Sequence, residues 1–164
     1  MNGFLSLAQE ILRMFEADQA MRDEAKRRNL DRDVAMDERH SARIGELVAQ
    51  YGWPTIPMVG RRAAQAAWLL VLHADHDPDF QQQCLDLMRR AAEGEVEPAQ
   101  VAYLEDRVRV NTGQPQLYGT QFCRMEGAFA PYPIEDEEGL DDRRAAMGLE
   151  SFDEYYRWMM ERFR

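Results

Sequence analysis

The segment from His73 to Asp77 brings two imidazoles and two carboxylates together, directly after the most apolar stretch of the chain. Imidazole exchanges protons near neutral pH, and the carboxyl end of a helix favours its protonated form. We therefore predict that His73 is a general acid or base and that Asp75 orients it. A structural alternative stays open, in which His73 caps the carbonyls of one helix and Asp77 caps the next helix.

The chain has three histidines, His40, His73 and His76. His73 and His76 are three residues apart, a spacing that suits two metal ligands on one helix, and His40 or a nearby carboxylate could complete the site. The metalloprotease pattern His-Glu-x-x-His is absent. A His-ligated, metal-dependent hydrolase is therefore a weaker hypothesis, and we expect no resident metal and no other cofactor.

A second candidate for chemistry is Arg107, in the run Asp106-Arg107-Val108-Arg109 near the end of a predicted helix. It lies beside an apolar seam, so it could reach into a pocket and hold an anionic group of a substrate. The alternative is a solvated helix end, where Arg107 compensates exposed carbonyls and pairs with Asp106.

A third candidate is the segment 114–122, which carries three amides, a phenol and a hydroxyl around a glycine and a proline. Ordered loops of this composition often carry function because a scaffold holds them over a cavity. We predict that Gln116, Thr120 and Gln121 bind substrate and that Tyr118 donates a proton or a hydrogen bond. A turn whose side chains satisfy backbone groups is the alternative.

These residues must be positioned by helices, because apolar residues recur at three- and four-residue spacing along most of the chain. The interval 113–135 has no such period and reads as an irregular loop or a short hairpin. We predict an all-α, compact bundle of about six helices with this one insert. The main predicted helices are 4–28, 31–51, 61–73, 78–93, 98–111 and 152–163, with a shorter one at 143–149.

Length and charge limit the class of protein. The chain has 164 residues, 45% of them hydrophobic, which suits a single domain over 1–164 with its own core. Its net charge is −10 and it has no basic stripe, which argues against nucleic acid and against an anionic membrane surface. There is no secretory signal and no spanning apolar run, and the two cysteines lack metal or redox spacing. We expect a cytoplasmic protein.

Several blocks occur together and in order, and this set resembles a bacterial family known only as a domain of unknown function. The similarity covers about residues 37–149 and supplies no activity. It implies that the polar blocks, and not the first helix, identify the family. The blocks are Gly52-Trp53-Pro54-Thr55, His73-Ala74-Asp75, Asp106-Arg107-Val108, Tyr118-Gly119-Thr120-Gln121 and Pro133-Ile134-Glu135-Asp136.

From these observations we expect a small enzyme that acts on a small polar or anionic metabolite by cofactor-independent acid–base chemistry, as a hydrolase, lyase or isomerase. This hypothesis needs His73, Arg107 and the loop at Gln116–Gln121 to face one cavity. The alternative is a non-catalytic binding or immunity-type protein whose contact surface is the acidic run 135–142 together with the mostly charged second half of the first helix, past Asp18. The first helix is a candidate for homodimer formation.

Overall fold

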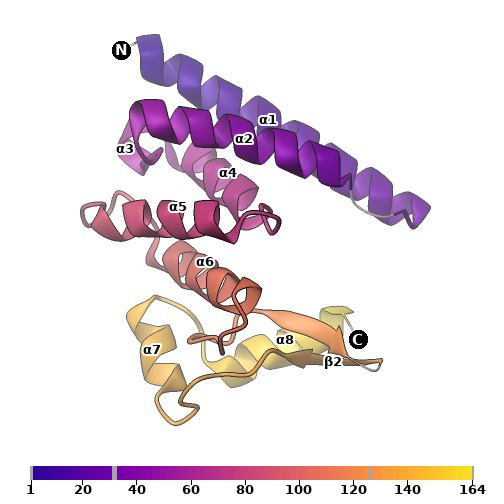
Figure 1. Ribbon diagram of the computed structural model, residues 1–164. Helices are drawn as coiled ribbons and strands as arrows, with labels where there is room; N and C mark the ends of the chain where they lie inside the picture. Colours follow the sequence, from indigo (N-terminus) through magenta and orange to yellow (C-terminus); the bar gives the residue numbers. More distant parts are fainter. Residues whose placement is uncertain (1, 31–32, 126, 164) are drawn as a thin grey trace. The chain divides into compact units, whose positions relative to one another are not determined.

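The computed structural model describes residues 2–30, 33–125 and 127–163. The chain divides into two compact units, residues 1–96 and 97–164. The expectation of a single domain over 1–164 stays a prediction. Eight helices and one two-stranded hairpin occur among the described residues, so the prediction of an all-α fold with a small irregular insert is confirmed (Figure 1).

The first unit consists of helices, and their bounds lie within a few residues of the predicted ones. The predicted start of the second helix, Asp31, lies outside the described residues; the helix begins at Val34, where the Asp33 side chain accepts a hydrogen bond from the amide of Met36 at 3.1 Å. The helices are α1 (Asn2–Arg28), α2 (Val34–Tyr51), α3 (Ile56–Val59), α4 (Arg61–Leu72) and α5 (Pro78–Arg90).

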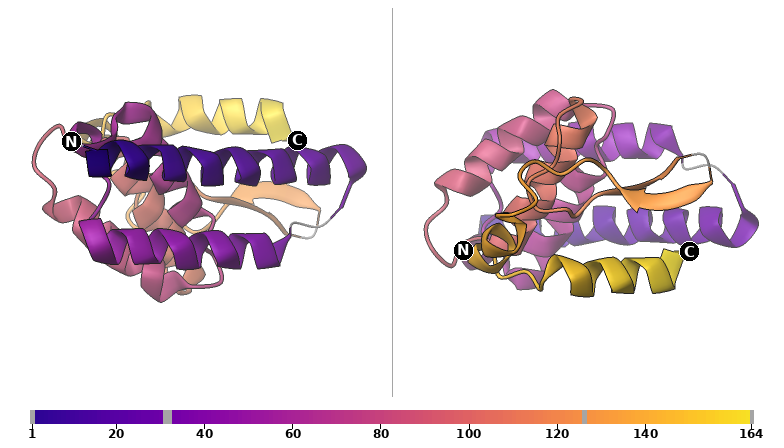
Figure 2. Two further views of the ribbon diagram at one scale, coloured as in Figure 1. Left: turned by 90° about the horizontal axis from the view of Figure 1, so that it is seen from above. Right: turned by 90° about the horizontal axis from the view of Figure 1, so that it is seen from below.

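The core of the first unit lies where α1, α2 and α4 pack together. Figure 2 shows α1 and α2 side by side along most of their lengths. Ile11 of α1, Ile44 of α2 and Leu70 of α4 are at most 2% exposed. Small residues of α4, including Ala67, are also buried, and short side chains let the neighbouring helices approach closely.

Two local features place the histidine segment at the end of α4. The helix stops at His73, whose amide donates to the carbonyl of Leu69 at 3.1 Å. Asp77 then caps α5 by accepting from the amide of Phe80 at 3.0 Å, and Pro78 fills the first turn, as the sequence predicts. The short helix α3 is not among the helices predicted from the sequence; Pro57 lies in its first turn, where no amide is needed.

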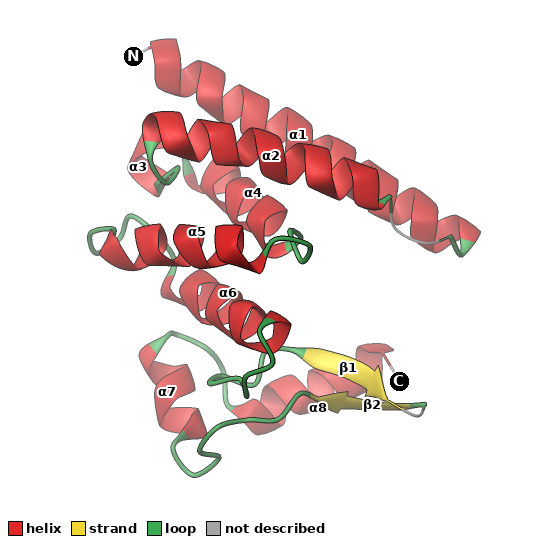
Figure 3. Ribbon diagram, viewed as in Figure 1, coloured by secondary structure: helices red, strands yellow, loops and turns green. Residues whose placement is uncertain are grey.

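The second unit contains α6 (Pro98–Asn111), β1 (Phe122–Met125), β2 (Ala128–Pro131), α7 (Leu140–Ala146) and α8 (Phe152–Phe163) (Figure 3). The strands are antiparallel, and Phe122 pairs with Pro131. The rings of Phe122 and Tyr156 lie 6.1 Å apart, so the hairpin packs on α8. Helix α7 begins three residues before the predicted position. No described helix is long and apolar enough to cross a membrane.

Candidate functional site

A buried carboxylate organises the polar residues of the first unit. Asp18 of α1 is 1% exposed. Arg22, one turn later, donates to both of its oxygens through Nε, at 3.0 and 3.1 Å, and through Nη2 to Asp37 of α2 at 2.6 Å. Gln19 donates to Asp18 at 2.8 Å. One arginine therefore bridges two buried carboxylates from two helices, and these carboxylates accept hydrogen bonds from its guanidinium and balance its charge inside the unit.

His73 lies against the same carboxylate. Its Nδ1 is 3.1 Å from Oδ2 of Asp18, an ion-pair distance, but Nδ1 is not aligned for a hydrogen bond. Such contacts are often poorly aligned until a ligand is bound. Burial by itself raises the pKa of Asp18, but His73 and Arg22 outweigh burial and hold the pKa below its usual range. Asp18 therefore stays ionised beside His73.

His40 belongs to the same group, called the Asp18 cluster: Asp18, Arg22, Asp37, His40 and His73. Its Nδ1 is buried and makes no hydrogen bond. Burial lowers the pKa of His40, and the charges of Asp18 and Asp37 act in the opposite direction. The neutral imidazole is therefore favoured at this position.

The third histidine, His76, contacts a residue of α2 that directly follows the cluster member His40. Its Nε2 is 2.8 Å from Oγ of Ser41, the residue that follows His40. All three histidines thus lie in one unit, as the metal hypothesis requires. However, no group of three or more metal-ligating side chains among the described residues is arranged to hold an ion. The His40, His73 and His76 site therefore gains no support from the geometry.

The second unit contains the other predicted residues, and its centre is Asp106 rather than Arg107. Asp106 is 0% exposed. Its Oδ1 accepts from the amides of Leu117 and Tyr118 at 2.7 and 3.0 Å, and its Oδ2 accepts from the amide and hydroxyl of Thr120, both at 2.9 Å. Burial raises the pKa of Asp106, and the donors of Thr120, Leu117 and Tyr118 oppose that effect. One carboxylate therefore binds three amides of the 116–121 loop.

The carbonyls of the same loop are bound from the other side by α7 and α8. Arg143 donates to the carbonyl of Leu117 at 2.9 Å, and Arg144 donates to that of Tyr118 at 2.5 Å. The hydroxyl of Tyr155 donates to the carbonyl of Thr120 at 3.1 Å. Arg144 is completely buried, and its guanidinium lies over the Tyr155 ring at 5.0 Å. The loop is thus held between one buried carboxylate and two arginines.

The two predicted amides are also part of this framework. Gln116 is fully buried; its Nε2 donates to the carbonyls of Gln121 and Tyr132, and its Oε1 accepts from the amide of Gln121 at 2.8 Å. Gln121 donates to Oγ1 of Thr120 at 2.9 Å. These contacts correspond to the structural alternative for Gln116, Thr120 and Gln121. A role in substrate binding stays a prediction.

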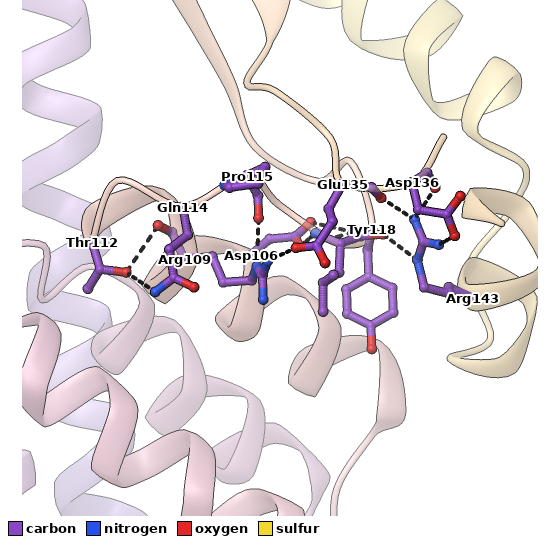
Figure 4. Close-up of polar contacts among 10 residues, drawn as sticks. Asp106, Arg109, Thr112, Gln114, Pro115, Tyr118, Glu135, Asp136 and Arg143 are labelled. Carbon is purple, nitrogen blue, oxygen red and sulfur yellow. Dashed lines mark hydrogen bonds and ion pairs between the residues drawn. The ribbon is translucent and has the colours of Figure 1, made fainter. Parts of the chain in front are cut away.

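The acidic run after the loop is divided between two environments. Glu135 pairs with Arg109, which also donates to the carbonyl of Pro115 at 2.6 Å, and Asp136 pairs with Arg143 at 3.0 Å. Figure 4 shows these contacts in one row, with the phenol ring of Tyr118 extending away from it. The first two carboxylates of the run therefore hold the loop and are not simply solvated.

The predicted site residues fall into two sets. His73 and Asp75 lie in the first unit, whereas Arg107, Tyr118 and the loop lie in the second. Sequence reasoning missed Asp18, the carboxylate found beside His73, and Arg22. Their four-residue spacing was the available signal, but exposed helix pairs share it. Asp75, proposed from sequence to orient His73, keeps that role only as a prediction.

A comparison with known protein families agrees with the resemblance seen in the sequence. The model of a family of unknown function, DUF6624, matches residues 5–163. The match extends beyond 37–149 and takes in the first helix, including Asp18. The chain matches no curated protein and no solved structure. Since the matched region is nearly the whole chain, the protein belongs to the family of unknown function DUF6624.

Proposed function

We propose that the protein is a small cytoplasmic enzyme that uses His73, with Asp18 beside it, as a general acid–base group on a polar metabolite. One observation carries the proposal: a carboxylate that is 1% exposed lies 3.1 Å from Nδ1 of His73. In such a dyad the carboxylate fixes the proton on Nδ1 and stabilises the imidazolium. The other ring nitrogen, Nε2, is then the atom that exchanges protons with a substrate.

Accessibility and charge support this role. The His73 side chain is 19% exposed, so one edge reaches solvent while Nδ1 is buried. Arg22 is already bound by two carboxylates and has little capacity for a substrate anion. Two aspartates and one arginine give the cluster a formal charge of −1 before the histidines are counted. The proposed substrate is therefore neutral or cationic at the reacting end.

The test is depletion of metabolites from a cell extract by the purified protein, measured by mass spectrometry. The wild-type protein should convert at least one metabolite, and His73→Gln should lower the rate by about 100-fold or more, because positioned acid–base groups typically contribute 10²–10⁴-fold. Gln65→Glu on exposed α4 surface is the control and should keep the activity. Conversion at equal rates by wild type and His73→Gln would refute the role of His73.

A binding function is the second candidate, and one pocket of the second unit favours it. This pocket, of about 310 Å³, has an apolar floor that includes Ile134, Leu140 and Phe152. Glu137, Glu138, Asp141 and Asp153 line its rim, and no ion pair with a described residue is formed by any of the four. A basic segment of a partner protein suits this combination of charge and apolar surface.

Binding of an arginine-rich peptide, measured by calorimetry, tests this second candidate. Glu137→Gln with Glu138→Gln should weaken binding by at least tenfold, whereas Asp142→Asn, a carboxylate of α7 that does not line the pocket, should have little effect. Equal losses in both variants would indicate general charge attraction and would count against the pocket.

The homodimer suggested by the first helix also remains a proposal. Phe4 and Leu5 of α1 are 46% and 62% exposed. Their exposure supports an interface there, because large exposed apolar side chains that occur together are unusual on a monomer. Light scattering on the wild type and on Leu5→Glu tests it; a dimer should become monomeric in the variant, and a monomeric wild type contradicts the proposal.

A further inference from the structure

A second histidine of the first unit contacts a possible nucleophile. Oγ of Ser41, on α2, is 2.8 Å from Nε2 of His76. That distance lies within the range found for an activated serine and its general base. Ser41 is buried at 6% exposure, whereas His76 is exposed, so the pair consists of one buried and one solvent-accessible side chain.

The pair lines a pocket. Its volume is about 370 Å³, within the range of small-molecule sites, and it lies between α2 and the start of α5. Ala42 and Gly45 line the α2 side, and the Phe80 ring, which lies 3.5 Å from the position of a Cβ on Gly45, supplies an apolar wall. Glu38 and Asp77 add carboxylates to the lining. A short, uncharged acyl group fits this lining, and an anionic group is disfavoured.

The hydroxyl of Ser41 has two possible partners. Oγ also lies 3.0 Å from the carbonyl of Glu38, a common contact for a serine within a helix. A hydroxyl has one proton, so it donates either to this carbonyl or to His76. Rotation about the Cβ–Oγ bond exchanges the two states, and only the state that donates to His76 is reactive.

We propose that Ser41 is a nucleophile and His76 its general base, and that the pocket accepts small uncharged carboxylic esters. Oγ of Ser41 would form a bond to the carbonyl carbon while its proton passes to Nε2 of His76. The bond from the carbonyl carbon to the alcohol oxygen then breaks, and His76 returns the proton to the departing alcohol. Water hydrolyses the resulting serine ester by the same steps, releasing the acid and restoring Ser41. This activity goes beyond the His73 site and does not require it.

The expected reactivity is modest. No hydrogen bond among the described contacts orients the far side of the His76 ring, and Asp77 is used to cap α5. A nucleophile and its base work best when a third group orients the base. Acylation of Ser41 by an activated reagent should therefore be slower than in serine hydrolases that have such a group.

Covalent labelling tests the pair without knowledge of the natural substrate. The intact protein is incubated with an alkyl fluorophosphonate, which transfers its phosphonyl group to a reactive serine oxygen as fluoride leaves. One adduct per chain, mapped to Ser41 by peptide mass spectrometry, is the expected result. His76→Asn should slow labelling by at least tenfold, and Gln65→Glu, on the exposed surface of α4, should leave it unchanged.

The other two serines of the chain provide matched controls. Ser6→Ala and Ser151→Ala should label at the wild-type rate, whereas Ser41→Ala should not label. Absence of an adduct on wild-type Ser41, or labelling at the same rate in His76→Asn, would overturn the proposal. Since His73 is untouched in these variants, failure here leaves the metabolite assay of His73 as a separate result.

Discussion

Replacement of Asp106 by asparagine tests the account of the 116–121 loop. The carboxylate accepts hydrogen bonds from four donors while 0% exposed, and Oδ2 accepts from both the amide and the hydroxyl of Thr120. Asparagine keeps one acceptor oxygen and directs an NH₂ group at two donors. Hydrogen bonds to a charged group contribute about 1.5–3 kcal/mol each, so we expect Asp106→Asn to cost about 3–5 kcal/mol of unfolding free energy.

Urea denaturation measures the total loss, and amide hydrogen exchange locates it. A local loss of about 3 kcal/mol corresponds to roughly a 100-fold faster exchange of the amides of Leu117, Tyr118 and Thr120. Asp142→Asn, an exposed carboxylate on α7, is the control and should change stability by less than about 0.5 kcal/mol. A loss below about 1 kcal/mol in Asp106→Asn, with unchanged exchange at these amides, would refute the reasoning.

Three further predictions concern stability. The folded pKa of Asp18 lies below its unfolded value of about 3.9, so its contribution to the free energy of unfolding is complete above that pH and decreases as the pH falls below it. In urea denaturation at several pH values, Asp18→Asn should therefore lose less stability than the wild type as the pH falls. An equal loss in both proteins would contradict this prediction. Arg144→Met removes bonds to the carbonyls of Tyr118 and Glu150 and should cost about 2–4 kcal/mol by denaturation; a neutral effect would show that these bonds add no net stability. Gly119→Ala should lower the thermal unfolding temperature more than Gly148→Ala. Both glycines have left-handed φ, but only at Gly119 would the new Cβ lie 2.6 Å from the Phe152 ring, and equal shifts in unfolding temperature would exclude that clash.

Most helices were predictable from sequence because their signals are local. Periodic apolar residues and the Asp77-Pro78 cap fix α4 and α5 without reference to the rest of the chain. The short helix α3 was not predicted, since two prolines in five residues suit both an extended path and a first helical turn.

The polar contacts were less predictable, because residue type does not reveal burial. Gln116 and Gln121 suit a ligand and a buried turn equally well. Only the fold shows that the Gln116 amide donates to the carbonyl of Gln121 and that the Gln121 amide donates to the carbonyl of Tyr103 in α6. Asp18 resembles any member of an exposed helical pair until α2 and α4 bury it. Its contact with His73 spans 55 positions of the sequence, a separation that local patterns do not encode.

The contact between Asp18 and His73 can be measured most directly by the ¹⁵N chemical shifts of the His73 ring near neutral pH. We expect the neutral ring to carry its proton on Nδ1, facing Asp18, in the wild type and in Asp75→Asn, and to lose this preference in Asp18→Asn. A wild-type ring protonated on Nε2, or a change caused by Asp75→Asn alone, would contradict Asp18 as the group that orients His73.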